Sequence, residues 1–295
     1  MDLIAEPFIN DLHFGESPRW HEDRLWFSDF YDHGVWAVDE DGEGERIVEV
    51  DGQPSGIGWL PDGSMLVVSM LDRKLMRFSN GEINEYADLT GVAKFLSNDM
   101  VVSSSGIAYV GDFGFDLHGT IETKGEAAIY EPPGPPTTSL AIVNADGSVS
   151  KGPGEMFFPN GSVILPDGKT LIVGESLSMR LTAFDINLDG SLSNRRIWAN
   201  LSSALCVPDG ICLDAEGCIW VANAIANQCL RVREGGEVLA KVETPHKCYA
   251  CMLGGKDKKT LFMMSAPSSQ PSVVEHNRIG QIVMARVDVP GAGLP

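Results

Sequence analysis

The chain has 295 residues, with 41 acidic and 22 basic side chains and a formal net charge of −19. This charge repels phosphate backbones, so we do not expect nucleic-acid binding. No apolar run reaches the ~20 residues that a membrane-spanning helix needs, and the first ten residues lack a basic segment followed by an apolar one. We therefore expect no membrane association and a cytoplasmic location.

A short hairpin recurs six times along the chain. Residues 160–176 are typical: an apolar strand, a tight Pro-Asp-Gly turn and a second apolar strand. The copies begin at Glu16, Ser55, Asn98, Asn160, Asp209 and Tyr249, which we call the register residues. Four residues after each of them stands an apolar residue: Trp20, Trp59, Val102, Ile164, Leu213 and Leu253. This common register indicates a structural repeat.

A third strand with a Gly-containing turn follows each hairpin, and a fourth follows most copies. The fourth strand is less clear after Leu140, and the last copy ends at Pro295 without one. Residues 3–9 form an apolar segment with no hairpin, and we expect them to pair with residues 282–287. Four-stranded units repeated six times are typical of a propeller. The sequence thus predicts an all-β fold: one six-bladed β-propeller over residues 1–295, with four antiparallel strands per blade and an N-terminal strand closing the last blade.

Two inserts interrupt the repeat, at about residues 113–139 and 267–278. The Pro and Gly content of the first predicts an ordered loop in place of a regular element. Long loops on a rigid scaffold commonly carry binding function.

The register residues are candidates for a metal site, because inner strands of a propeller line its channel and equivalent residues meet at one height. Glu16, Asn98, Asn160 and Asp209 would bring two carboxylates and two carboxamides together, and such oxygen donors suit Ca²⁺ or a similar divalent ion. The alternative is that the polar side chains line a water-filled channel without binding a metal. We favour this alternative for Ser55 and Tyr249.

All six cysteines lie in the last third of the chain. Cys248 and Cys251 form a C-x-x-C pair, but no second pair at zinc-site spacing accompanies it. We expect the cysteines to be reduced thiols in the core.

Four motifs carry a resemblance to a known family. They are GESPRWHEDRLWFSD at residues 15–29, the pair Asn98-Asp99, FPNG at residues 158–161 and VPDGICLD at residues 207–214. In this order they resemble the regucalcin, gluconolactonase and luciferin-regenerating-enzyme family (senescence-marker-protein-like) over essentially the whole chain. The resemblance implies one bound divalent metal and lactone hydrolysis.

The same resemblance assigns site residues. The family's metal-binding Glu, Asn and Asp correspond to Glu16, Asn160 and Asp209. Asn98 matches an Asn that lies beside the metal and the substrate, so we count Asn98 both as a metal ligand and as a substrate-binding residue. Ca²⁺ is the expected ion, with Mn²⁺, Mg²⁺ and Zn²⁺ as alternatives. Asp209 is our candidate for the general base that activates water.

One departure bears on the substrate. Sugar-lactone members often carry an Arg where this chain has Leu96, and Lys94 is the nearest alternative contact. Phe113 and Phe115 on the first insert make the expected rim more apolar, unless they only pack the insert onto its own blade.

His118 is a candidate auxiliary acid or base, or else an ordinary surface histidine. We therefore expect a lactonase acting on a small lactone that is more apolar than an aldonolactone. Hydrolysis of a phosphotriester, cleavage of the C–C bond of a β-diketone, and a non-enzymatic calcium- or ligand-binding propeller remain alternatives.

Overall fold

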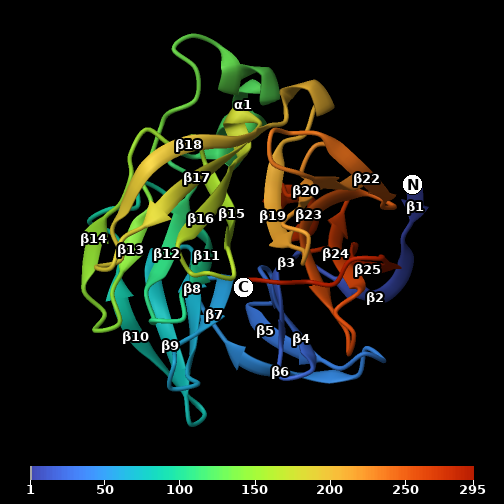
Figure 1. Ribbon diagram of the computed structural model, residues 1–295, viewed down its shortest axis with the longest axis horizontal. Helices are drawn as coiled ribbons and strands as arrows, with labels where there is room; N and C mark the ends of the chain where they lie inside the picture. Colours follow the sequence, from blue (N-terminus) through green and yellow to red (C-terminus); the bar gives the residue numbers. More distant parts are fainter. Residues whose placement is uncertain (1) are drawn as a thin grey trace.

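The computed structural model describes residues 2–295 as six β-sheets arranged around a central axis (Figure 1). This confirms the predicted six-bladed β-propeller. The predicted extent of the domain, residues 1–295, includes Met1, which lies outside the described residues. None of the helices within residues 2–295 has the length and hydrophobicity needed to cross a membrane.

Each blade is an antiparallel sheet whose strands follow one another outward from the axis. Blades I to III comprise β3 (Gly15–His21), β4 (Arg24–Asp29), β5 (Gly34–Val38) and β6 (Gly44–Glu49); β7 (Pro54–Trp59), β8 (Met65–Ser69), β9 (Lys74–Ser79) and β10 (Glu82–Asp88); β11 (Ser97–Val102), β12 (Ala108–Asp112), β13 (Ala141–Val143) and β14 (Val149–Lys151). The fourth strand that was unclear after Leu140 is β14, which has only three residues.

Blades IV to VI repeat this plan with two additions from the N-terminus. Their strands are β15 (Pro159–Ile164), β16 (Thr170–Glu175), β17 (Arg180–Ile186) and β18 (Leu192–Asn200); β19 (Pro208–Leu213), β20 (Ile219–Asn223), β21 (Gln228–Val232), β22 (Val238–Glu243) and β1 (Asp2–Ile4); β23 (Lys247–Gly254), β24 (Thr260–Ala266), β25 (Gly280–Arg286) and β2 (Glu6–Leu12).

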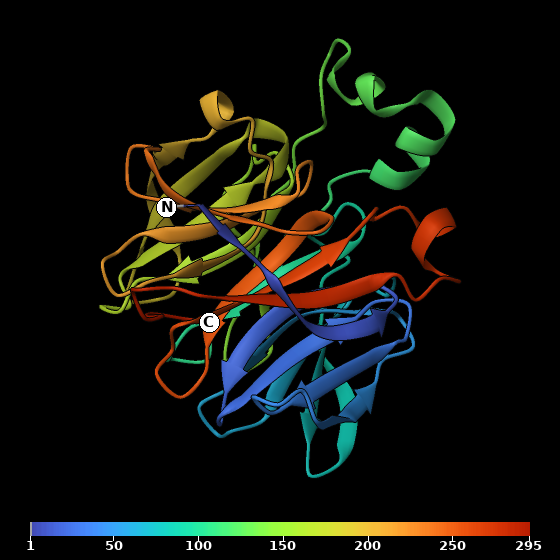
Figure 2. The same cartoon turned by 90° about the vertical axis from the view of Figure 1, so that its right-hand side faces the viewer.

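The N-terminal segment closes the ring, as predicted, but it also joins two blades. β2 pairs antiparallel with β25 and supplies the missing outer strand of blade VI. β1 pairs in parallel with β22 of blade V instead, placing Leu3 opposite Val242. The chain crosses from blade V to blade VI near Ala5, whose N–H donates to the carbonyl of Glu243 at 2.9 Å (Figure 2). The expectation that all of residues 3–9 pair with the last blade was therefore wrong for Leu3 and Ile4.

Close backbone packing near the axis holds the blades together. Each of the six inner strands contacts the inner strand of the next blade. Glycine permits this approach, because a Cβ at Gly161 would lie 2.5 Å from the carbonyl oxygen of Asp209. Farther out, apolar side chains of adjacent sheets interdigitate, as Val163 and Ile172 of blade IV do with Ile211 and Val221 of blade V. Each sheet thereby buries faces that it could not bury alone.

Both inserts connect the second and third strands of their blades and contain short helices. The first, after β12, carries helix α1 (Leu117–Lys124) and the 3-10 helix η1 (Glu126–Tyr130), and the second, after β24, carries α2 (Pro271–Val274). The 3-10 helices η2 (Ser176–Ser178) and η3 (Ser202–Ala204) lie in connections of blades IV and V. The first insert was predicted to be irregular, and this was wrong because it contains a helix. Asp116 caps the N-terminus of α1, where its side chain accepts from the N–H of Gly119 at 2.8 Å.

The strand pairing places both inserts at one end of the channel. The start of an inner strand lies opposite the end of the second strand, with Ser97 opposite Asp112 and Lys247 opposite Ala266. The inserts continue directly from Asp112 and Ala266, so they project from the edge where the inner strands begin (Figure 2).

The C-terminal segment crosses the other end of the channel, and the C-terminus lies near the centre of the ring (Figure 1). Leu294 forms a bridge with Ile164 of blade IV, the N–H of Ala292 donates to the carbonyl of Leu213 of blade V, and the N–H of Gly291 donates to the carbonyl of Lys258 of blade VI. This segment lines a second cavity together with residues at the far ends of the inner strands, among them Gly58 and Val102.

Candidate active site

Irregular strand pairing turns the register residues toward the channel. Five of them occupy the second position of their inner strand, and Tyr249 occupies the third. In all six blades the pairing of the inner strand shifts at this point, for example between Glu16 and Arg19 and between Pro208 and Ile211. A β-bulge removes a residue from the regular ladder and redirects its side chain. The repeat therefore places six side chains around the axis at one height, which we call the first ring.

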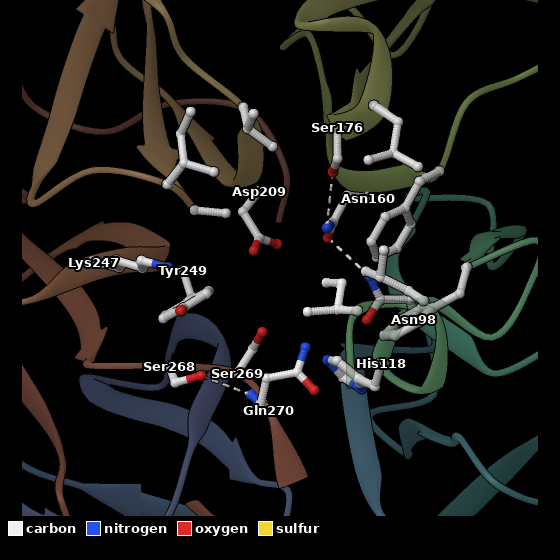
Figure 3. A pocket seen from close by; sticks show the side chains of 18 of the residues that line it. Asn98, His118, Asn160, Ser176, Asp209, Lys247, Tyr249, Ser268, Ser269 and Gln270 are labelled. Carbon is white, nitrogen blue, oxygen red and sulfur yellow. Dashed lines mark hydrogen bonds between the residues drawn. The ribbon is translucent and has the colours of Figure 1, made fainter. Parts of the chain in front are cut away.

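A cavity of about 180 Å³ opens between the inserts, and the first ring forms its floor (Figure 3). Glu16, Asn98, Asn160 and Asp209 all line it, and their exposed fractions are 5%, 6%, 4% and 9%. The structure thus brings together the four residues predicted as metal ligands. Tyr249 lines the cavity as well, whereas Ser55 lies behind Asn98, with 3.3 Å between its Oγ and Asn98 Oδ1.

Hydrogen bonds orient the two carboxamides (Figure 3). The Nδ2 of Asn98 donates to Oδ1 of Asn160 at 2.9 Å, and the Nδ2 of Asn160 donates to Oγ of Ser176 at 3.2 Å. The hydroxyl of Ser176 in turn donates to the carbonyl of Pro208 at 2.7 Å. An amide oxygen has two lone pairs, so Oδ1 of Asn160 can accept from Asn98 and still serve as a ligand.

The two carboxylates of the first ring lack a cationic partner. Within residues 2–295, neither Glu16 nor Asp209 forms an ion pair, because Arg19 is bound to Asp99 at 2.6 Å. Burial raises the pKa of Glu16 well above its ordinary value, and the negative charges of Asp209 and Asp99 raise it further. Burial, followed by the charge of Asp99, raises the pKa of Asp209 in the same direction. A divalent cation between the two carboxylates would relieve this electrostatic cost.

The chemistry of the donors fits a hard divalent ion. No three His, Cys, Asp or Glu side chains in the described part of the chain gather closely enough to hold a metal. The first ring contributes two residues of these types, and its remaining ligands would be carboxamide oxygens of Asn160 and Asn98. A set made only of oxygen atoms with two negative charges suits Ca²⁺ better than a soft metal.

The predicted substrate residues separate into two groups. Phe113 and His118 line the cavity, and their rings contact each other with a centroid distance of 5.7 Å. Leu96 and Phe115 are not among the described residues that line it. The side chain of Leu96 packs against the core, and its carbonyl accepts from the N–H of Phe113 at 3.0 Å. Lys94 is exposed, and its Nζ donates to the carbonyl of Thr137 at 2.5 Å.

His118 is uncharged at neutral pH. Burial lowers its pKa to about 4, although the charge of Asp116 acts in the opposite direction. The imidazole can therefore accept or donate a hydrogen bond, but it does not bring a positive charge to the cavity.

Sequence reasoning missed a second ring of cavity residues directly outside the first. Its members each stand two residues before a register residue, and they are Phe14, Phe158, Val207 and Lys247. Side chains in a strand repeat every two residues, so this spacing was a usable signal. Gln53 and Leu96 hold the equivalent positions in blades II and III but are not among the described lining residues.

The second insert adds polar groups that the sequence did not single out. Ser268, Ser269 and Gln270 line the cavity next to blade VI, and the N–H of Gln270 donates to Oγ of Ser268 at 3.0 Å. The first insert instead contributes apolar groups, including Leu117, Ile121 and Ile129. The cavity is therefore polar on one side and apolar on the other.

These observations define a class of protein: a six-bladed β-propeller with an acidic, oxygen-rich site at one end of its channel. Residues 14–267 match the family model described as SMP-30/Gluconolactonase/LRE-like region, and the chain belongs to this family. Membership indicates a lactonase-like or calcium-binding function.

Individual relatives agree with this assignment. Regucalcin from Gallus gallus is 26% identical over 258 residues, which cover 85% of this chain and 83% of the relative. A solved luciferin-regenerating enzyme has the same fold, with a TM-score of 0.80 at 20% identity and coverage of 99% and 98%. A calcium-binding protein, regucalcin from Agrobacterium tumefaciens, matches with a TM-score of 0.78 at 18% identity and coverage of 100% and 98%.

Proposed function

We propose that this protein is a divalent-metal-dependent lactonase whose substrate is less polar than an aldonolactone. The observation that carries the proposal is the pair of buried carboxylates, Glu16 and Asp209, at the floor of a largely apolar cavity. Membership in a family named for gluconolactonase supports lactone hydrolysis. The phenylalanines Phe14, Phe113 and Phe158 in the cavity wall support a substrate with apolar substituents.

Glu16, Asn160 and Asp209 would hold the ion. When bound, the ion would polarise the lactone carbonyl and offset the negative charge that develops on its oxygen. Asn98 has one Nδ2 hydrogen bonded to Asn160 and a second that can donate to the substrate.

Asp209 would accept the proton of the attacking water. The hydroxyl then adds to the carbonyl carbon and the ring C–O bond breaks. The leaving oxygen takes the proton held by Asp209, which gives a hydroxy acid and restores the carboxylate. The surrounding phenylalanines exclude bulk water, which strengthens the electrostatic interactions at the reacting atoms.

A non-enzymatic calcium-binding role is the second candidate, because the same first ring would bind an ion without any reaction. The similarity to regucalcin, named as calcium-binding in one solved structure, favours it.

A lactone panel separates the two functions. Gluconolactone, alkyl-substituted lactones and aromatic lactones are assayed with Ca²⁺, Mn²⁺, Mg²⁺ and Zn²⁺, beside metal-free enzyme. We expect kcat/KM for the alkyl and aromatic lactones to exceed that for gluconolactone by at least tenfold, since each buried CH₂ contributes ~0.8 kcal/mol. Metal binding without turnover of any lactone would favour the calcium-binding role. Preferred turnover of gluconolactone would contradict the apolar substrate.

A further inference from the structure

Lys247 lies in the cavity wall and has no role in the reaction proposed above. It begins β23 and belongs to the second ring, whose other members Phe14, Phe158 and Val207 are all apolar. Figure 3 shows its side chain on the same side of the cavity as Tyr249. The sequence repeat therefore provides one cationic position in a ring that is otherwise apolar.

Lys247 has no ionic partner among the described residues. The carboxylates that line the same cavity are Glu16, Asp209 and Glu126, and none of them forms an ion pair with it. Glu126 is exposed on η1, where solvent screens its charge. Within residues 2–295, Lys247 is the only Lys or Arg that lines the cavity.

A substrate that fills the cavity removes water from Lys247. Taking an ammonium group out of water is unfavourable unless a negative charge accompanies it. Hydroxyl groups of a substrate could already be bound by Ser268, Ser269 and Gln270, and would not offset this cost. The net charge of −19 repels anions from the protein as a whole, so an anionic substrate needs such a local cation.

We propose that Lys247 binds a carboxylate group of the substrate. The substrate class is then lactones in which an apolar portion and a single carboxylate take the place of the many hydroxyls of an aldonolactone. The carboxylate lies against Lys247 and the hydroxyls of the second insert, and the apolar portion lies against Phe113, Leu117 and Ile121. This proposal rests on the proposed lactonase function of the same cavity.

The test compares two lactones that differ only in charge: 5-oxotetrahydrofuran-2-carboxylate and its carboxamide. With metal-loaded enzyme, kcat/KM for the carboxylate should exceed that for the carboxamide by about tenfold or more, because hydrogen bonds between charged groups are stronger than neutral ones. Lys247→Met should reduce this ratio to about one or below, and Lys247→Arg should retain most of it. Lys169→Met is the matched control, since it removes the same charge from an exposed turn of blade IV and should leave the ratio unchanged.

Binding supplies a readout that does not depend on turnover. The ketones 3-oxocyclopentane-1-carboxylate and its carboxamide cannot be hydrolysed, and calorimetric titration should show the carboxylate binding about tenfold tighter to the wild type but not to Lys247→Met. If neither lactone is hydrolysed while this difference in binding holds, the lactonase function is wrong and anion recognition stands. If both lactones are hydrolysed with the same ratio in wild type and Lys247→Met, anion recognition is wrong and the lactonase function stands.

A contact between Lys247 and Glu126 across the cavity mouth is the competing explanation. In that case Lys247→Met and Glu126→Gln would each lower kcat/KM for both lactones alike and leave the ratio between them unchanged. Under our proposal Glu126→Gln removes a negative charge from the rim, and the preference for the carboxylate is retained or increased.

Discussion

In the proposed reaction Asp209 has two roles, metal ligand and general base, that one substitution can separate. Asp209→Asn keeps an oxygen that can bind the ion but removes the negative charge and the ability to accept a proton. Added metal can restore occupancy, but it cannot replace the base. We therefore expect kcat at saturating metal to fall by ~10²–10⁴-fold.

Asn160→Asp is the matched variant for this experiment, because it preserves a ligand and adds a charge at the neighbouring position of the first ring. Its kcat at saturating metal should fall less. If Asp209→Asn keeps near-wild-type kcat once metal is saturating, Asp209 is a ligand only and the base is another group.

His118 makes the stability of the protein dependent on pH. Its pKa is about 4 in the folded protein, below the ordinary 6.5, because the ring is buried. The unfolded chain therefore binds a proton at this residue as the pH falls below ~6.5, whereas the folded protein does so only near 4. Stability present above pH 6.5 is lost progressively between these values, on the order of 1–2 kcal/mol at pH 5.

His118→Gln should reduce the loss of stability between pH 7 and pH 5, as measured by urea unfolding at both values. His276→Gln, at an exposed position of the second insert, serves as the control. An unchanged pH dependence in His118→Gln would show that the imidazole is as accessible to protons in the folded state as in the unfolded state.

Individual side chains of the site were predictable where the repeat determines them. Glu16, Asn98, Asn160 and Asp209 share a register and a bulge, so their meeting around the axis followed from periodicity. The prediction that Leu96 contacts substrate was misleading. Its carbonyl accepts from the N–H of the cavity residue Phe113, but its side chain packs against the core.

The N-terminal strands allow a test of how the ring is closed. Deletion of residues 1–12 removes β2 and exposes the edge of β25. It also removes Phe8, Ile9 and Leu12, which pack in the core of blades I and VI. Burial of such side chains contributes ~1.5–3 kcal/mol each, so Tm should fall by roughly 5–10 °C for a chain of this size.

Deletion of residues 1–4 is the control for this truncation. It removes only β1, the three-residue strand on blade V, and we expect less than half of that decrease. Tm of both variants is measured by differential scanning calorimetry. Equal decreases in Tm would mean that β2 adds nothing to ring closure.

The first insert shows where pattern reasoning failed for an element. Its Pro and Gly residues predicted irregular structure, but the eight residues of α1 form a helix, and Gly119 lies within it. A helix this short has little periodicity to detect, and it is stabilised by the Asp116 cap and by its contacts over the cavity. The polar groups of the second insert escaped notice for a related reason, since loop conformation decides which of its residues reach the cavity.

Bound metal should stabilise the propeller as a unit, because the proposed ligands come from blades I, IV and V. An ion that binds only the folded state adds about 2.7 kcal/mol when its concentration is ~100 times the dissociation constant. Exhaustive chelation should therefore lower Tm, and adding Ca²⁺ back should restore it. An unchanged Tm, in protein shown by metal analysis to contain an ion before chelation, would contradict this linkage.

The C-terminal segment crosses the end of the channel opposite the candidate site. There it ties blades IV, V and VI together, and the second cavity is lined by Arg19, which forms a buried ion pair with Asp99. Under the proposed function, we expect substrate, water and product to share the mouth between the two inserts. A hydroxy acid that has not yet left blocks the next lactone from entering, so product inhibition should be competitive with substrate, and the opening of that mouth sets an upper limit on turnover.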